Sequence, residues 1–167
     1  MDKKIAQVAA AMMQKNLGDK RRIEHSLKVY AYAQYLGHSE TINAQLQETL
    51  EVTALLHDIG IHVSEKKYGK CTSLDQEKEG PPVARDILEN LGFKTDLVER
   101  VCYIISKHHT FSAVDLLDFQ LLVEADFLVN SSEDNMSDYQ IIHFAKNIFR
   151  TESGLNCLRL LYPHIAF

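Results

Sequence analysis

The hydrophobic positions of this chain recur mainly at intervals of three and four residues, which is the spacing of a buried helix face. Runs with the strict alternation of a half-buried strand are scarce. The periodic stretches predict helices at residues 3–16, 21–37, 42–57, 81–91, 94–109, 115–130 and 137–152, with a short last one near 154–161. We therefore expect an all-α fold, a compact bundle of about six to eight helices.

Several residues mark the ends of these helices. Asp19 is placed to cap the second helix, and Pro81-Pro82 suits the first turn of the fourth. Gly92 and Gly154 are expected to mark a helix end and a turn.

One long stretch, from Gly60 to Gly80, shows no helical period and predicts a loop. Loops of this length in compact domains are usually functional or disordered. This one carries Lys66, Lys67 and Lys70. Two interpretations are open: a basic lid that recruits an anionic group, or a solvated cluster of lysines.

Composition narrows the class of protein. The chain has 167 residues, 46% of them hydrophobic and 25% charged, as expected of one soluble globular domain spanning 1–167. We expect the helices within 137–161 to pack on the rest. The net charge of -5 argues against a general nucleic-acid coat protein, and no segment approaches the roughly 20 apolar residues that span a membrane. Three widely spaced cysteines form no Cys-x-x-Cys pair, so we expect a cytoplasmic protein.

The most informative feature is His57-Asp58, which lies between the apolar run Leu55-Leu56 and the pair Ile59-Gly60. A buried carboxylate without a partner is strongly disfavoured. At the end of a helix, the backbone can turn and let both side chains converge on one ligand. A histidine that interacts with the helix dipole beside a capping aspartate is the alternative, but it explains one of the two residues better than both.

Four other residues fall on or near buried helix faces. His25 shares a stripe with apolar residues, and Asp126 lies in the middle of a buried face, whereas Glu124 is expected to point to solvent. His108 and His109 end another helix, where they could bind a metal or simply complement the helix dipole. A core role for His25 is the alternative to metal binding. Together, imidazoles and carboxylates from several helices favour a divalent transition metal (Mn, Fe, Co, Ni or Zn) over Mg or Ca.

The order His25, then His57-Asp58, then Asp126 resembles the H…HD…D signature of the HD superfamily of metal-dependent phosphohydrolases. The segments 22–29, 54–60 and 124–128 look like its motifs, so the resemblance covers about residues 20–130. It implies an all-helical fold in which these four residues bind one metal.

Relatives with two metals add two histidines between the His-Asp pair and the last aspartate. His109 resembles the second of these, with His108 as an alternative or additional ligand. Where the first is usual, this chain has Gln76, Glu77 and Glu79 and no histidine. One ion is therefore expected, and a second is the alternative.

The resemblance implies hydrolysis of a phosphate monoester or diester in a nucleotide or similar small molecule. The metal would lower the pKa of a water molecule and polarise a phosphoryl oxygen. We expect Asp58 to accept the proton of that water and His108 to contact the phosphate or a second metal. Lys66 and its neighbouring lysines, or Arg85 and Lys107, would neutralise substrate charge. Arg21 or Arg22 could also reach a phosphate.

Two other classes of function remain open. One is an HD-type oxygenase with a di-iron centre. The other is a non-catalytic regulatory module that binds a metal or ligand. The leucine-rich end of the chain could pack on the core or on a second copy, so a homodimer is also open.

Overall fold

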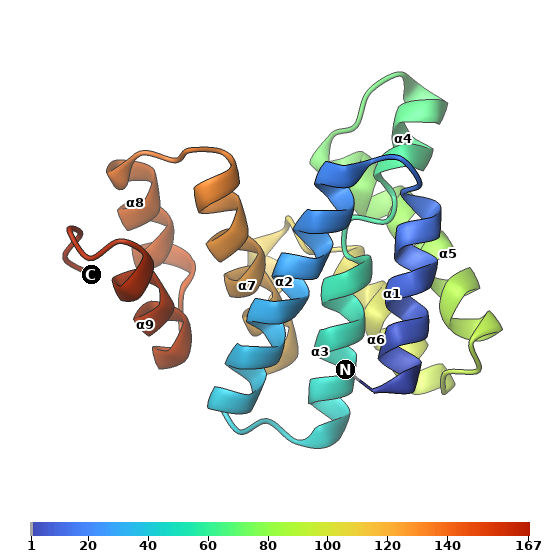
Figure 1. Ribbon diagram of the computed structural model, residues 1–167, viewed down its shortest axis with the longest axis horizontal. Coiled ribbons are helices and arrows are strands. Elements are labelled where there is room, and N and C mark those ends of the chain that lie inside the picture. Colours follow the sequence, from blue (N-terminus) through green and yellow to red (C-terminus); the bar gives the residue numbers. More distant parts are fainter. Residues whose placement is uncertain (1) are drawn as a thin grey trace.

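The computed structural model describes residues 2–167, and all the regular structure within them is helical (Figure 1), which confirms the all-α prediction. The elements in chain order are α1 (Lys3–Lys15), α2 (Lys20–Ser39), α3 (Ala44–Leu56), α4 (Ile61–Tyr68), α5 (Ser73–Asn90), α6 (Thr95–Ile105), the short 3-10 turn η1 (Phe111–Ala113), α7 (Leu117–Glu133), α8 (Asp138–Ile148) and α9 (Glu152–Leu161). None of the helices in this range is both long and apolar enough to cross a membrane.

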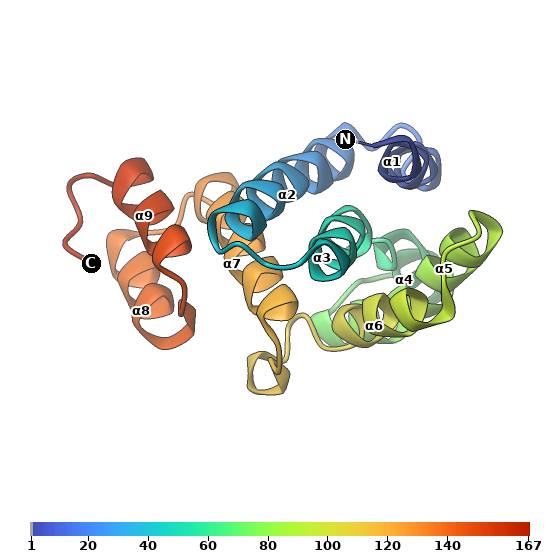
Figure 2. The same cartoon turned by 90° about the horizontal axis from the view of Figure 1, so that it is seen from below.

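Helix α3 lies at the centre of the bundle. It packs against α1, α2, α6 and α7, and Figure 2 shows it between α2 on one side and α5 and α6 on the other. Every residue from Thr49 to Leu56 is buried, so this helix has no solvent face over its last two turns. Its C-terminal end therefore delivers the next residues, His57 and Asp58, into the interior.

Helices α8 and α9 form a pair at one end of the molecule, beyond α7 (Figure 2). Helix α9 contacts both α7 and α2. Glu124 of α7 binds the segment that leads into α9. Our expectation that Glu124 points to solvent was therefore wrong. Its side chain is buried and accepts hydrogen bonds from the backbone N–H groups of Arg150 (2.7 Å) and Thr151 (3.1 Å) and from the Thr151 hydroxyl. Burial raises the pKa of Glu124.

The prediction of a loop from Gly60 to Gly80 was also wrong, because this segment contains α4 and the first half of α5. Helix α4 ends at Gly69, whose φ of +70° suits glycine. Helix α5 begins with a capping box: Thr72 accepts from the backbone N–H of Asp75, and the Asp75 carboxylate accepts from that of Thr72. The first two turns of α5 are mostly polar, so no apolar stripe reveals them in the sequence.

Consequently Pro81 and Pro82 lie inside α5 and not in its first turn. Gly80 precedes them, and a Cβ on Gly60 would lie only 2.5 Å from the backbone nitrogen of Gly80. The backbone of α5 therefore crosses the turn after His57-Asp58 at a distance that only glycine allows.

Other predicted boundaries are partly right. Asp19 caps α2 by accepting from the backbone N–H of Arg22 (3.1 Å), and Gly92 has a φ of +69° just after α5, both as expected. Helix α6 ends at Ile105, so the histidines predicted inside it lie in the following turn. Gly154 lies in the first turn of α9 and not in a turn between helices.

Candidate metal centre

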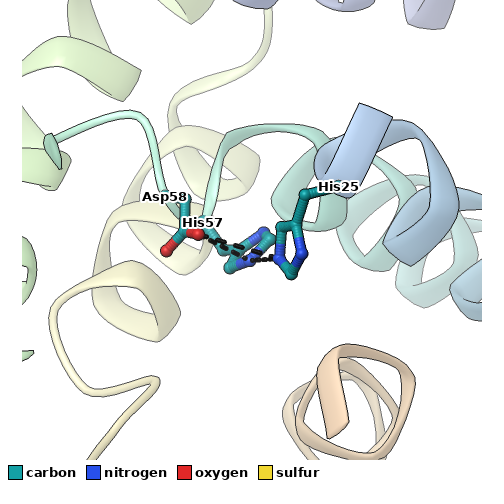
Figure 3. Close-up of side chains that lie close together, drawn as sticks. All are labelled: His25, His57 and Asp58. Atoms are coloured by element: carbon teal, nitrogen blue, oxygen red, sulfur yellow. Dashed lines mark hydrogen bonds and ion pairs between the residues drawn. The ribbon is translucent and has the colours of Figure 1, made fainter. Parts of the chain in front are cut away.

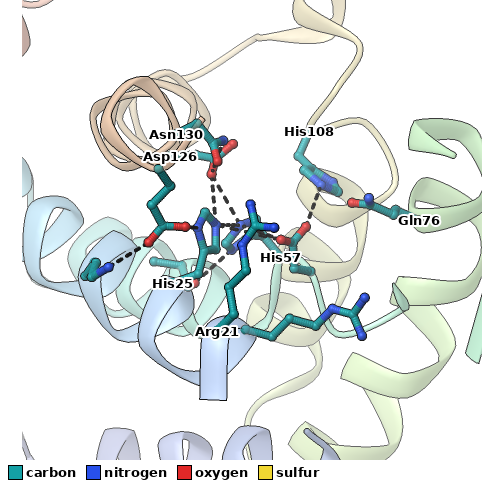
Figure 4. A network of polar contacts seen from close by, with 12 residues as sticks. Arg21, His25, His57, Gln76, His108, Asp126 and Asn130 are labelled. Atoms are coloured by element: carbon teal, nitrogen blue, oxygen red, sulfur yellow. Dashed lines mark hydrogen bonds and ion pairs between the residues drawn. The ribbon is translucent and has the colours of Figure 1, made fainter. Parts of the chain in front are cut away.

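The predicted histidines and carboxylates come from four places in the fold and meet beside the end of α3. His25 lies in the second turn of α2, His57 caps the C-terminus of α3, and Asp58 follows it (Figure 3). Asp126 approaches the two histidines from α7, and His108 lies in the turn after α6 (Figure 4). Residues about 100 positions apart in the chain thus share one cluster.

The donor atoms in this cluster are spaced as ligands of one ion. His25 Nε2 lies 3.3 Å from His57 Nε2, 3.2 Å from Asp126 Oδ1 and 3.7 Å from Asp58 Oδ2. His57 Nε2 lies 3.5 Å from Asp126 Oδ1 and 3.6 Å from Asp58 Oδ2. Metal bonds of about 2.0–2.2 Å place neighbouring ligand atoms about 3–3.5 Å apart. The spacing therefore fits a transition metal.

Hydrogen bonds to the other ring nitrogens fix which atom of each histidine faces the cluster. His57 Nδ1 donates to the carbonyl oxygen of Ala54 (2.9 Å). His25 Nδ1 donates to Glu133 Oε2 (3.1 Å), and Lys28 binds the second oxygen of that carboxylate (2.7 Å). With Nδ1 acting as donor, the Nε2 lone pair of each neutral ring is free for a metal.

His108 shows the same arrangement and gives the clearest test of whether these residues suit a metal ion. Its Nδ1 donates to the carbonyl oxygen of Ile105 (2.7 Å). Its Nε2 lies 3.6 Å from Asp58 Oδ1, is buried, and has no hydrogen-bond partner among residues 2–167. An orphaned buried nitrogen beside a carboxylate is costly. A cation is the partner that both atoms would share.

Asp58, His108 and His109 form a second group of ligand atoms, all within 4.8 Å of one another, which shares Asp58 with the group formed by His25, His57 and Asp58. His109 Nε2 donates to Gln76 Oε1 (2.9 Å). Burial, followed by the neighbouring His108, lowers the pKa of His109 to about 4. His109 is therefore neutral near pH 7, as a metal ligand must be.

Of Gln76, Glu77 and Glu79, which stand where the resemblance implies a histidine, only Gln76 contacts the ring of His109. Glu77 accepts from the backbone N–H of His109 (3.1 Å) and from Thr110 Oγ1 (2.9 Å), so it supports the turn. Glu79 points elsewhere and binds Lys67 (2.9 Å).

The carboxylates of the cluster favour added positive charge on the histidines. Burial alone would lower the pKa of His57, but Asp58 and Asp126 outweigh it and raise this pKa to about 9. The pKa of His25 is raised for the same reason. In turn, the histidines lower the pKa values of Asp58 and Asp126 against the effect of burial. One divalent cation bound by neutral imidazoles would supply the charge of two imidazolium protons.

Two hollows open onto the cluster, and both are lined by Asp58, Asn130 and Asp134. The first, of about 280 Å³, also has Arg21 and Arg22 in its wall. The second, of about 300 Å³, is bordered by aromatic side chains. The cluster is therefore accessible to a small molecule from two sides.

The basic residues expected to meet a substrate are mostly elsewhere. Lys66 is exposed on α4 and lines neither hollow, so the structure does not bring it to the cluster. Arg85 is paired with Glu99 (2.6 Å). The positive charges at the rim belong instead to Arg21, whose side chain is 76% exposed and contacts Asp134 at 3.3 Å, and to Arg22. Arg22 is paired with Asp19 (2.9 Å) and Glu65 (2.6 Å).

Sequence reasoning missed Glu133, which orients His25, and a role for Asn130, which donates to Asp126 Oδ1 (2.9 Å). Asp126, Asn130 and Glu133 are spaced by four and three residues on α7, so they share one face of that helix. The helical spacing of these three polar residues is the signal that could have identified them.

The fold and site define an all-α protein with a histidine–carboxylate cluster suited to a divalent metal. The model of the HD domain family matches residues 22–141, and the chain belongs to that family. It is similar to the crystal structure of a predicted HD superfamily hydrolase from an uncultured Thermotogales bacterium. The TM-score is 0.69 at 21% identity, over 95% of this chain and 85% of the other, which shows a shared fold. A search of curated proteins found no match.

Proposed function

We propose that this protein is a divalent-metal-dependent phosphohydrolase that acts on a phosphate monoester or diester of a small molecule, with nucleotides as the first class to test. The observation that carries the proposal is the set of three buried histidines, His25, His57 and His108, whose Nδ1 atoms are all held as donors. Their Nε2 atoms therefore face Asp58 and Asp126, where a metal ion would replace any proton that they carry. The structural relative is described as a predicted hydrolase, and that description supports a hydrolytic reaction for this chain.

In this proposal His25, His57, Asp58 and Asp126 hold the ion. When bound, such an ion acts as a Lewis acid on a phosphoryl oxygen and lowers the pKa of water. The other steps belong to side chains of this chain.

Asp58 is the group proposed to take up the proton of the attacking water. It lines both hollows, and its lowered pKa keeps it ionised near neutral pH. Arg21 is proposed to attract the anionic substrate, since it is largely exposed at the rim of a site that otherwise carries mostly acidic groups, whereas Arg22 is already paired with Asp19 and Glu65. Lys66 is not part of this proposal, because its side chain lines neither hollow.

A centre with two ions is the second candidate. It is favoured by the overlap of the two ligand groups at Asp58, with His108, His109 and Gln76 on the second side. In that arrangement, His108 serves as a ligand and not as a contact to the phosphate. Iron in both positions, with colour in the purified protein, would favour the oxygenase chemistry instead.

The test is phosphate release from a panel of phosphate monoesters and diesters by protein loaded with Mn, Fe, Co, Ni or Zn. Asp126→Asn should lose metal affinity and turnover together, by more than the roughly 10- to 100-fold typical of losing a residue that only orients a ligand. Asp86→Asn, an exposed carboxylate of α5, is the matched control and should change neither.

No turnover of any ester by the loaded protein would refute a phosphohydrolase and favour a binding module. Unchanged turnover in Asp126→Asn would refute the site.

A further inference from the structure

The second hollow beside the cluster has an aromatic wall that the metal chemistry does not require. Phe127 and Phe144 are stacked, with ring centroids 3.8 Å apart and planes 8° from parallel. Phe111 meets Phe144 edge to face, with centroids 5.3 Å apart. Met136 completes the apolar side of this hollow of about 300 Å³.

Two of these rings remain open to solvent beside a polar cluster. Phe111 is 38% exposed, and Phe144 is half-buried. An aromatic side chain that served only to fill the core would be buried, as Phe127 is. Phe111 also follows His108-His109-Thr110 directly, so one short segment carries both cluster residues and part of the aromatic wall.

Polar groups also line the same hollow. Asp58, Asp126, Gln76 and Asn130 are among its lining residues, and Figure 4 shows the amide of Asn130 beside Asp126. The hollow near Arg21 and Arg22 offers no comparable aromatic wall. A ligand held at the cluster by its phosphate can therefore place an anionic part on one side and an apolar part on the other.

We propose that the substrate is a phosphate ester that carries a flat aromatic ring, and that this ring binds in the hollow, against the exposed parts of Phe111 and Phe144 and beside Met136. The proposal rests on the proposed phosphohydrolase function and narrows its substrate class. Offset or edge-to-face contact with aromatic rings and contact with a thioether both favour such a group. The volume is at the small end of ligand sites, which suits one ring system better than a dinucleotide.

The experiment compares the binding of phenylphosphonate and methylphosphonate to metal-loaded protein by isothermal titration calorimetry. The carbon–phosphorus bond of both probes resists phosphate-ester hydrolysis, so binding is measured without turnover. Phenylphosphonate should bind roughly tenfold more tightly, as expected for one or two aromatic contacts. Phe144→Ala and Phe111→Ala should each remove most of this preference and leave methylphosphonate binding unchanged.

Phe149→Ala is the matched control. Its ring belongs to the same aromatic cluster, 5.7 Å from Phe127 and 6.3 Å from Phe144, but it does not line the hollow. It should keep the preference for phenylphosphonate. If Phe144→Ala fails to fold, Phe111→Ala still decides the question, because Phe111 lies on the exposed 3-10 turn.

Equal binding of the two phosphonates, binding of neither, or a preference that survives both alanine variants would overturn the aromatic site. Phosphate release tests the proposed function separately. Selective binding of phenylphosphonate without turnover of any ester would sink the phosphohydrolase and leave the ring site in place. If esters are turned over but the two phosphonates bind equally, the phosphohydrolase stands and the ring site is refuted.

Discussion

Three hydrogen bonds on the outer side of the cluster determine which ring nitrogen of each histidine faces the metal site. Two of the acceptors are backbone carbonyls, those of Ala54 and Ile105, and no substitution removes them directly. The third is the carboxylate of Glu133, which can be changed without touching a ligand. Glu133 therefore offers a way to test ring orientation separately from ligand loss.

Glu133→Gln should weaken metal binding by about 10- to 100-fold, because the loss of charge weakens the hold on His25 and lowers the basicity of its ring. Competition with a chelating dye measures the effect. Glu24→Gln, an exposed glutamate on α2 outside the cluster, is the control and should bind metal normally. Equal affinities in the two variants would show that Glu133 does not orient the ligand.

Metal affinity should fall as the pH falls. The pKa of His57 is raised to about 9, so its ring holds an extra proton over most of the physiological range, and the pKa of His25 is raised as well. A cation must displace such protons, and each proton released weakens binding about tenfold per pH unit below the pKa. Titrations with zinc or manganese at pH 6, 7 and 8 measure this slope. An affinity that is constant over this range would contradict proton competition.

At the scale of elements, the crossing of Gly60 and Gly80 joins the turn after α3 to α5. Helix α5 carries Gln76 and Glu77, both of which hold the turn of His109. The position of the second ligand group therefore depends on how closely α5 approaches the first.

Gly60→Ala should destabilise the protein by about 1–3 kcal/mol, because the new Cβ meets backbone that must move. It should also weaken any binding of a second ion more than the first. Thermal unfolding and metal titration measure the two effects. Gly69→Asn is the control: its position is open and its φ of +70° tolerates asparagine. A variant as stable as the control would show that the crossing has room.

The elements that sequence could predict are those with an apolar stripe and a visible end. His57 ends α3 where the apolar run stops, and Asp19 caps α2. The polar start of α5 left no such stripe. Glu124 was misplaced because α7 is buried on nearly all sides, so the polar face that a helical wheel suggests does not exist there. Arg21 lies beside the cluster and Lys66 does not. This difference depends on tertiary packing that no local sequence pattern encodes.

At the scale of the whole molecule, the cluster joins α2, the end of α3, the turn after α6, and α7. Helices α2, α3 and α7 also pack extensively on one another. Metal binding should therefore stabilise the folded chain and not only the site.

Adding metal at about 100 times its dissociation constant should raise stability by about 2.7 kcal/mol. For a chain of this size, that corresponds to a rise in Tm of roughly 5–10 °C. Melting curves with metal and with EDTA measure the shift, and elemental analysis counts one or two ions per chain. His25→Ala should lose the shift, whereas His164→Ala, at an exposed position outside the cluster, should keep it. A Tm that metal does not change would refute this link.

Asp58 directs Oδ2 toward His25 and His57 and Oδ1 toward His108. If each oxygen serves a different ion, the two binding equilibria cannot be independent, since one carboxylate conformation must satisfy both. The first ion to arrive then selects the orientation of Asp58 that the second requires, while its charge opposes that second ion. The net sign of this coupling decides whether the centre fills in one step or in two separated steps. A single side chain would thus set the range of metal concentrations over which the protein changes state.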